Sequence, residues 1–292
     1  QIMANEKSVV GPWQPFSKFR GSRIVMEVSG EPVAYDDYRE EFSFPNNFSM
    51  VRTLVDSKGN FYSVRGLAAT KYSSDGDVLW VYTPHEEEIK SSYIGPDDKM
   101  YLILGGQNGD SIVRLDHEGD EEKRITIDDV TAPTTNRISL AVDGNFNIIY
   151  TGSLGEHIVI RKISSDGRLL WTYNTSFADD AKLAIDKDDN VYALGRGSTQ
   201  IIKINAEGDE LWSVLGEFSS THSAFCVGDD GYLYIGTSSG KSYKVDPLTG
   251  EMVWTLRPQS SETVDALWAD AHGNIYYGAR DNLLRKFSPN RN

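Results

Sequence analysis

Five residues that could do chemistry occupy the same position in successive repeats of this sequence. Aligning the repeats on their tyrosines puts each member at or beside the start of an expected strand; the set is Lys90, Arg137, Lys182, His222 and Asp265. If these strands meet around one axis, the set forms a mixed but locally basic collar that could attract an anionic small molecule or a partner's acidic loop. The alternative, which the sequence favours, is that the charges only solvate a water-filled channel.

His222 is the candidate for acid–base catalysis, because it begins a strand that is expected to line this channel. An imidazole beside a carboxylate there could transfer protons. The histidines His85, His117, His157, His222 and His272 do not show the i, i+4 or short-loop spacing of a zinc site. The sequence therefore predicts no metal site and no cofactor, and it leaves His222 as a weak catalytic candidate.

Four further segments resemble reactive sites but are better explained as turns, surface or core. Gly236–Gly240 matches a nucleophile elbow, which requires a strand–turn–helix corner, yet it separates two expected antiparallel strands. Asp186–Asn190 is rich in oxygen ligands but lacks the bidentate glutamate that ends an EF-hand loop. The acidic run Glu86–Glu88 is most simply a solvated surface. The single cysteine, Cys226, excludes an internal disulfide and lies in an apolar run.

A sequence repeat positions these groups along the chain. Its aromatic anchors are Tyr62, Tyr101, Tyr150, Tyr192, Tyr234 and Tyr276, and from Tyr150 onward they lie 42 residues apart. The clearest copy contains four short segments separated by glycine and aspartate turns: His222–Val227, Tyr232–Gly236, Ser242–Val245 and Met252–Leu256. Four short antiparallel strands in each repeat of about 40 residues are typical of a β-propeller blade.

The repeats predict an all-β protein: a seven-bladed β-propeller, or one of six blades, with four antiparallel strands per blade. We expect one domain over residues 1–292. Seven blades result if the degenerate first repeat, with Phe19 in the anchor position, is a blade of its own; six result if it completes the last blade. Because the last repeat lacks a fourth strand, we expect an N-terminal strand near Ser8–Trp13 to complete it and close the ring.

Two motifs resemble the repeats of known propeller families. Gly231–Gly236, Lys244–Asp246 and Thr249–Trp254 together resemble the quinoprotein-like repeat, which is found in alcohol dehydrogenases and in an outer-membrane assembly lipoprotein. Gly273–Gly278, followed by Leu284–Phe287, is similar to NHL-type repeats. The resemblance covers most of the chain from about Ser49 onward, and it implies the fold far more than the function.

The quinoprotein resemblance implies how the blades pack and which cofactor to consider. It implies that the repeat tryptophans pack against the neighbouring blade; these are Trp80, Trp171, Trp212 and Trp254. One repeat has Glu121–Arg124 where this tryptophan should be, which puts that contact in doubt. A bound quinone in that family often accompanies an adjacent cysteine pair, which this chain lacks, so we expect none.

Charge and hydropathy limit the classes of partner. A formal net charge of −14 works against binding to nucleic acid or to anionic lipid, because both require a cationic surface. No stretch approaches the about 20 apolar residues of a membrane-spanning helix, and the start of the chain lacks the apolar core of a signal peptide. The sequence therefore favours synthesis in the cytoplasm, or a place in a virus particle, over secretion.

The expected function is that of a non-enzymatic binding or assembly scaffold. It would present the loops between its blades to a protein or saccharide partner, for instance as a structural component of a virus particle. The complete repeat pattern, without a convergent catalytic set, motivates this interpretation. The alternative is a propeller-type lyase or lactonase that acts at the channel mouth with His222.

Overall fold

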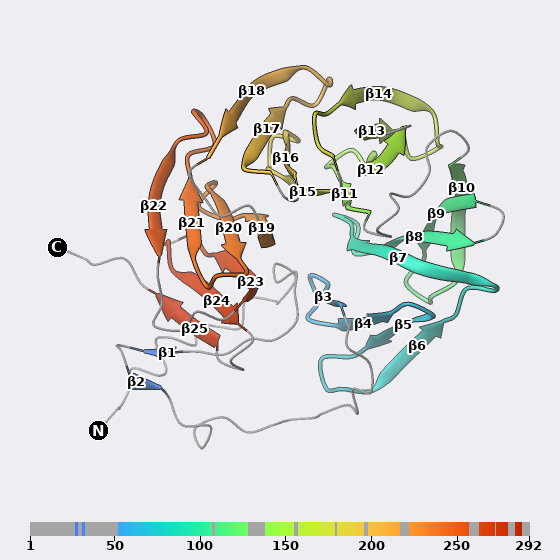
Figure 1. The fold of residues 1–292 in the computed structure, drawn as a ribbon. Coiled ribbons are helices and arrows are strands. Elements are labelled where there is room, and N and C mark those ends of the chain that lie inside the picture. The colour runs from blue at the N-terminus through green and yellow to red at the C-terminus, as the bar shows by residue number, and fades with distance from the viewer. Residues whose placement is uncertain are drawn as a thin grey trace.

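The computed structural model shows β-sheets arranged in a ring around a central axis (Figure 1). It describes residues 27–28, 31–32, 52–106, 109–127, 138–154, 157–178, 180–195, 198–216, 222–256, 263–271, 273–279 and 284–287. Regular structure in this part of the chain consists of strands joined by turns, as the all-β expectation required.

Five sheets of four antiparallel strands follow one another along the chain, and each forms one blade. The first blade contains β3 (Arg52–Val55), β4 (Phe61–Arg65), β5 (Ala68–Tyr72) and β6 (Val78–Tyr82). The second contains β7 (Glu87–Ile94), β8 (Met100–Gly106), β9 (Gly109–Leu115) and β10 (Glu121–Ile127). The third contains β11 (Leu140–Val142), β12 (Ile148–Leu154), β13 (His157–Ile163) and β14 (Leu169–Asn174).

The fourth and fifth blades repeat this order. The fourth contains β15 (Ala181–Ile185), β16 (Val191–Gly195), β17 (Gln200–Ile204) and β18 (Glu210–Leu215). The fifth contains β19 (His222–Val227), β20 (Leu233–Thr237), β21 (Ser242–Val245) and β22 (Met252–Leu256). All neighbouring strands within these blades are antiparallel.

Two smaller sheets contain the first and the last of the described strands. A three-stranded sheet contains β23 (Val264–Ala269), β24 (Ile275–Ala279) and β25 (Leu284–Phe287), and a short ribbon contains β1 (Glu27–Val28) and β2 (Glu31–Pro32). β1 contacts β25, so an early segment of the chain meets its last sheet (Figure 1). The segment expected to pair there, Ser8–Trp13, lies outside the described residues.

The expected number of blades is wrong. Seven blades, or six, were expected from the aromatic anchors, but the described residues form five complete blades of four strands. An anchor identifies a repeat of sequence, whereas a blade requires four paired strands. The repeat anchored by Tyr276 forms only the three-stranded sheet, and the degenerate first repeat contributes only the β1–β2 ribbon to the described structure. The propeller architecture itself is confirmed.

Strand order gives the ring two different faces. The first strands lie innermost and contact one another in sequence around the ring; they are β3, β7, β11, β15, β19 and β23 (Figure 1). Because adjacent strands are antiparallel, the turn between the second and third strands lies at the same edge as the linker to the next blade. We call this edge the linker face and the opposite edge the turn face. The first strands begin at the linker face.

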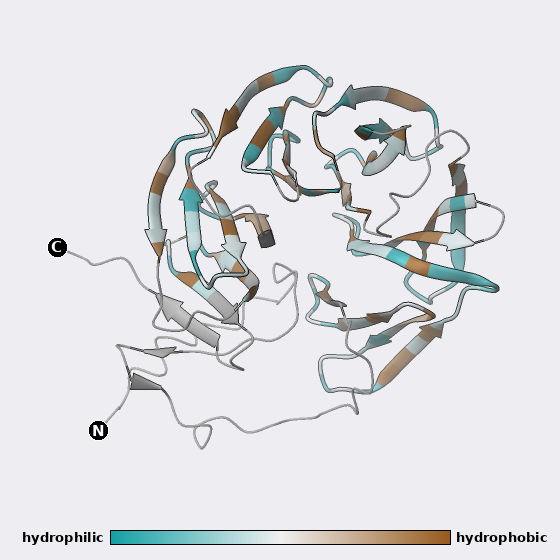
Figure 2. Ribbon diagram, viewed as in Figure 1, coloured by the Kyte–Doolittle hydropathy of each residue, from teal (hydrophilic) through white to brown (hydrophobic). Residues whose placement is uncertain are grey.

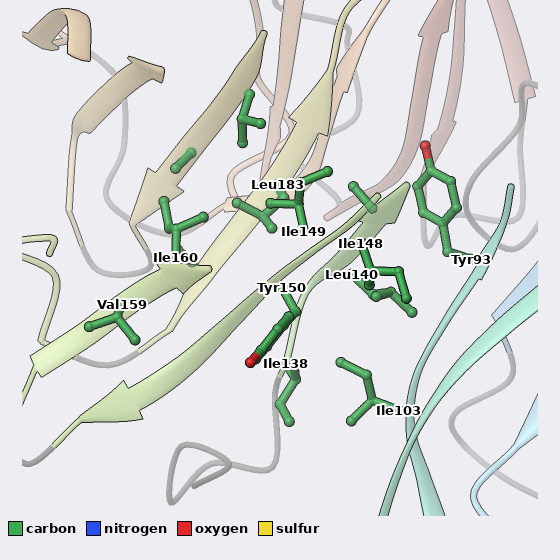
Figure 3. Packing of buried hydrophobic residues seen from close by; sticks show 14 of the residues in the cluster. Tyr93, Ile103, Ile138, Leu140, Ile148, Ile149, Tyr150, Val159, Ile160 and Leu183 are labelled. Carbon is green, nitrogen blue, oxygen red and sulfur yellow. The ribbon is translucent and has the colours of Figure 1, made fainter. Parts of the chain in front are cut away.

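Apolar contacts between blades form the core. The largest cluster joins the second, third and fourth blades and includes Tyr93, Ile103, Leu140, Tyr150 and Leu183 (Figure 3). Full burial of each such side chain stabilises the fold by about 1.5–3 kcal/mol. Apolar residues also appear on the outermost strands β6, β14, β18 and β22 (Figure 2). Much of β10 is charged instead, which distinguishes the second blade.

Three tryptophans of the outermost strands bind the next blade, as the family resemblance implied. Their indole N–H groups donate to backbone carbonyls: Trp80 to His117 at 3.0 Å, Trp171 to Ala206 at 3.0 Å and Trp212 to Pro247 at 3.1 Å. The rings also lie against glycines of the next blade; a Cβ atom on Gly119 would be 2.7 Å from Trp80. Each contact therefore combines apolar packing with one directed hydrogen bond.

The second blade lacks this contact. Lys123 of β10 pairs with Arg114, the register position that Trp171 occupies opposite Lys162 in the third blade. Ile125, two residues further on, packs against Gly167 of the third blade. A pocket of about 10 Å³ remains beside Lys123 and Ile125, which is space for about one water molecule.

We expect Lys123→Trp to raise the free energy of unfolding by about 1 kcal/mol, as other cavity-filling changes do. The indole would fill the pocket, and its N–H would point toward Ser165, which lines the pocket. Urea unfolding measures the change. A loss of stability would show instead that Ile125 already fills the available space and that the larger ring is overpacked.

Candidate functional site

A buried carboxylate, tyrosine and lysine form a polar cluster in the first blade. The Tyr62 hydroxyl donates to Asp56 Oδ2 at 3.1 Å, and Lys71 Nζ lies 3.3 Å from the same oxygen. Burial opposes ionisation of Asp56, but hydrogen bonds from Asn60 and the charge of Lys71 outweigh it and lower the pKa of Asp56. Burial, together with the Asp56 charge, raises the pKa of Tyr62 far above its usual value. In a single copy, this cluster would be a candidate acid–base site.

The cluster recurs around the ring, so it belongs to the fold. Its other copies include Lys162–Asp143 at 2.8 Å in the third blade, Tyr192–Asp186 at 2.9 Å in the fourth, and Lys244–Asp230 at 2.8 Å with Tyr234–Asp230 at 2.6 Å in the fifth. In each copy the carboxylate also accepts backbone N–H groups of its own turn. The cluster thus satisfies buried polar groups and ties a turn to the second and third strands.

Stability is expected to fall above about pH 10, because the tyrosines of these clusters stay protonated in the folded chain. Tyr101 and Tyr276 belong to further copies, because their hydroxyls donate to Asp97 at 3.1 Å and to Asp270 at 3.2 Å. Burial is the largest cause that raises the pKa of Tyr101 to about 12 and that of Tyr276 to about 12. In the unfolded chain tyrosine titrates near 10. Because the folded pKa is raised, the stability present below pH ~10 is lost as pH rises toward ~12. Urea midpoints between about pH 8 and 11 measure this; a constant midpoint would contradict the expectation.

The structure places four of the five predicted site residues on the innermost strands. Lys90 lies in β7, Lys182 in β15, His222 at the first position of β19, and Asp265 in β23. Arg137 lies outside the described residues. Since these strands contact one another around the ring, the four residues occupy neighbouring strands, each in the half of its strand that lies toward the linker face. That they bind a ligand together stays a prediction.

A β-bulge recurs near the start of three of these strands, and the sequence analysis did not identify it. The register with the second strand shifts at Lys90 in β7, at Ser223 in β19 and at Asp265 in β23. A bulge inserts an unpaired residue and changes the direction of a side chain, and bulges are common beside functional sites. In the sequence, the feature that pointed to this position was the recurrence of charged residues and histidine there.

The charge of Lys90 is neutralised within its own blade. Its Nζ lies 2.7 Å from Asp110 Oδ1, and the two side chains are only 14% and 8% exposed. Gly105 permits this arrangement, because a Cβ atom there would be 1.9 Å from Lys90 Cε. This pairing weakens the basic character that the sequence suggested for the channel mouth.

An ionic network is found in the second blade and is not repeated in the other described blades. Arg124 contacts Glu87 at 2.9 Å and Glu121 at 2.7 Å, and it donates to Ser111 Oγ at 2.8 Å. Tyr82 of the first blade donates to Glu121 at 2.6 Å. The hydrogen bonds from Arg124 are the largest cause that lowers the pKa of Glu121. The network therefore fixes ionised side chains where the first two blades meet.

A groove lies on the linker face between the first and second blades. It is a broad depression of about 590 Å³ that is open to solvent, and it is lined by Leu67, Thr83, Pro84, Glu86, Glu87, Glu88, Gly105 and Gly106. Leu67, in the turn between β4 and β5, is 70% exposed. The acidic run therefore borders a concave surface with an apolar side, which its sequence alone did not indicate.

The remaining motifs have structural roles. Gly236–Gly240 forms the hairpin between β20 and β21, where Thr237 N donates to Lys241 O at 3.0 Å. Asp186 caps its own turn by accepting the Asn190 N–H at 2.9 Å. Cys226 is partly buried, and its thiol lies 2.9 Å from the Leu267 carbonyl oxygen. Both turn predictions are confirmed.

Neither a metal site nor a membrane-spanning helix is found among the described residues. In this part of the chain, no group of three or more His, Cys, Asp or Glu side chains is arranged to hold a metal ion. It also contains no helix with the length and apolar character needed to cross a membrane.

Comparisons with known proteins agree on the fold. A family model described as outer membrane protein assembly factor BamB matches residues 49–255 and 197–290. No curated protein matches the chain. The resemblance to quinoprotein-like propellers is thereby confirmed.

Similar solved structures include lyases. Selenomethionine-substituted virginiamycin B lyase from Staphylococcus aureus is 16% identical, with a TM-score of 0.63 over 82% of this chain and 84% of that chain. A catalytically inactive histidine-to-alanine variant of that enzyme with quinupristin is 15% identical, with a TM-score of 0.64 over 82% and 83%. A streptogramin B lyase is 13% identical, with a TM-score of 0.59 over 80% of each chain. At these identities the similarity shows the fold alone.

Proposed function

We propose that this chain, which belongs to the family of the outer membrane protein assembly factor BamB, is a non-catalytic module that binds a partner protein through its linker face. The family description supports a role in assembly and, with it, a protein partner. It favours an assembly role over the virus-particle role that the sequence also allowed.

One observation carries the proposal: the buried ionisable clusters recur from blade to blade. The cluster of Asp56, Tyr62 and Lys71 has counterparts in the third, fourth and fifth blades. A reaction at one active site needs its acid and base once, whereas a repeated fold needs its stabilising contacts in every repeat. The described features that do not repeat, the Arg124 network and the groove, lie where the first two blades meet.

A protein partner is better supported than a saccharide. Sugar binding commonly uses exposed aromatic rings, but Trp80, Trp171 and Trp212 are engaged in contacts between blades. The linker face offers carboxylates and backbone turns instead, which suit a polypeptide with complementary charge.

Photo-crosslinking in the native host tests which face binds. A photoreactive amino acid would replace Leu67, Ser176 or Ser239 on the linker face, and Asp166, Glu207 or Leu248 on the turn face. We expect one partner protein to be captured from the linker face only, and the purified partner to bind the purified chain. Equal capture from both faces, or failure of the purified pair to bind, would overturn the proposal.

The second candidate function is a lyase that acts at the channel mouth. It is favoured by the similarity to virginiamycin B lyase, for which a histidine variant is catalytically inactive. In this chain His222 is the histidine that the described residues place on an innermost strand, at the start of β19. Quinupristin incubated with the chain would be followed by chromatography. We expect it to remain intact; product that disappears with His222→Ala would favour the lyase.

A further inference from the structure

We infer that the groove between the first and second blades holds an extended basic segment of a partner protein, anchored by an apolar side chain. This inference rests on the proposed function and assigns a place and a chemistry to the partner contact. The groove is widely open to solvent, as a site for an extended segment must be, and its volume of about 590 Å³ is comparable to that of small-molecule sites, about 300–1,000 Å³.

The walls of the groove come from three connections at the same edge of the two blades. These are the β4–β5 turn with Leu67, the linker with Pro84 and Glu86, and the end of β8 with Gly106. The Ile89 N–H donates to the Gly66 carbonyl at 2.6 Å and ties the second blade to the β4–β5 turn of the first. A Cβ atom on Gly106 would lie 3.1 Å from Glu87 Cγ, so a larger residue there would crowd Glu87 and reduce the depth of the groove. The concave shape is therefore built into the backbone.

At the equivalent position between the third and fourth blades, an aromatic side chain of the linker packs onto the next blade. Phe177, six residues after Trp171, is only 2% exposed and packs onto Gly195, where a Cβ atom would be 2.3 Å from the ring. Six residues after Trp80, the first linker has Glu86, which is exposed. Leu104 stands at the strand position of Gly195 and is itself fully buried. The described residues that line the groove beside Leu67 include no aromatic ring like that of Phe177, so this surface is available to an apolar side chain from another molecule.

Charge selects a basic occupant. Among the described residues, Arg124 neutralises Glu87 at 2.9 Å, and Lys90 is bound to Asp110 at 2.7 Å. The Glu86 and Glu88 carboxylates have no cationic partner in the described part of the chain. They are left to attract Lys or Arg side chains of a segment whose apolar residue contacts Leu67, and the net charge of −14 reinforces this attraction.

Fluorescence anisotropy with a dye-labelled peptide of alternating lysine and leucine tests the inference, with a glutamate–leucine peptide of equal length as the negative probe. We expect the basic peptide to bind, and Glu86→Lys with Glu88→Lys to weaken it by about tenfold or more. Leu67→Ser should weaken it by several-fold. These residues are exposed, so the variants should melt like the parent chain.

A matched control separates the groove from the overall charge. Glu118→Lys with Glu207→Lys changes the net charge equally, but both residues are exposed on the turn face. We expect this control to change affinity by no more than about twofold. Equal weakening by both double variants, or no binding to the parent chain, would overturn the groove as the site. Crosslinking from Ser176 or Ser239 but not from Leu67 would refute the groove while leaving the proposed function intact.

Discussion

Lys162→Met is expected to lower the free energy of unfolding by about 3–5 kcal/mol. Lys162 Nζ lies 2.8 Å from Asp143 Oδ2, and the two side chains are 5% and 0% exposed. The same ammonium group donates to the Ala206 carbonyl of the fourth blade at 3.0 Å. Methionine has a similar volume, but it leaves the carboxylate buried without its cation and removes a hydrogen bond between blades. Urea unfolding at neutral pH measures the loss.

Two further variants show whether burial causes this loss. Lys99 pairs with Glu122 at 2.7 Å, but these side chains are 20% and 36% exposed, so Lys99→Met should cost at most about 1 kcal/mol. Asp143→Asn combined with Lys162→Met should recover part of the stability, because no charge then remains unpaired. Similar losses from Lys162→Met and Lys99→Met would contradict the assignment of a buried pair.

The strands and turns of a repeat could be predicted from the sequence because they depend on local chemistry. β19, β21 and β22 cover the residues expected: His222–Val227, Ser242–Val245 and Met252–Leu256. Alternating apolar residues set the strands, and glycines adopt the positive φ of the turns, as Gly250 does at 75°. The tryptophan contacts between blades were expected from the resemblance to quinoprotein-like repeats, and the structure shows them for Trp80, Trp171 and Trp212.

The blade count could not be predicted, because it depends on pairing between distant segments. An anchor tyrosine such as Tyr276 marks a repeat whether or not a fourth strand pairs with it, and here its sheet has three strands. Closing that sheet with a strand from the other end of the chain stays a prediction, because it depends on a long-range contact that no local pattern specifies.

The candidate groove was missed for the same physical reason. Glu86 and Leu67 belong to different connections, and Gly106 comes from the next blade. Each is unremarkable in its own sequence context, and only the packing of two blades creates a concave surface between them. The pairing of Lys90 with Asp110 likewise depends on a bulge and on the absence of a side chain at Gly105.

Trp171→Ala is expected to lower the free energy of unfolding by about 3 kcal/mol, a large effect for a partly exposed side chain. The indole packs against Gly208, where a Cβ atom would be 2.7 Å from the ring, and its N–H donates to the Ala206 carbonyl at 3.0 Å. Removing it opens a gap between the third and fourth blades. Loss of this contact should also promote local opening there, measurable as faster amide hydrogen exchange in β14 and β17.

Two control variants separate packing from hydrogen bonding and from position. Trp171→Phe keeps an aromatic ring but has no N–H donor, so it should cost about 1–2 kcal/mol. Lys123→Ala, at the equivalent position of the second blade, should change stability by less than about 0.5 kcal/mol, because no blade contact depends on that side chain. If Lys123→Ala lowered stability as much as Trp171→Ala does, the side chain at this position would stabilise its own outer strand. The loss from Trp171→Ala could then not be assigned to the contact with the next blade.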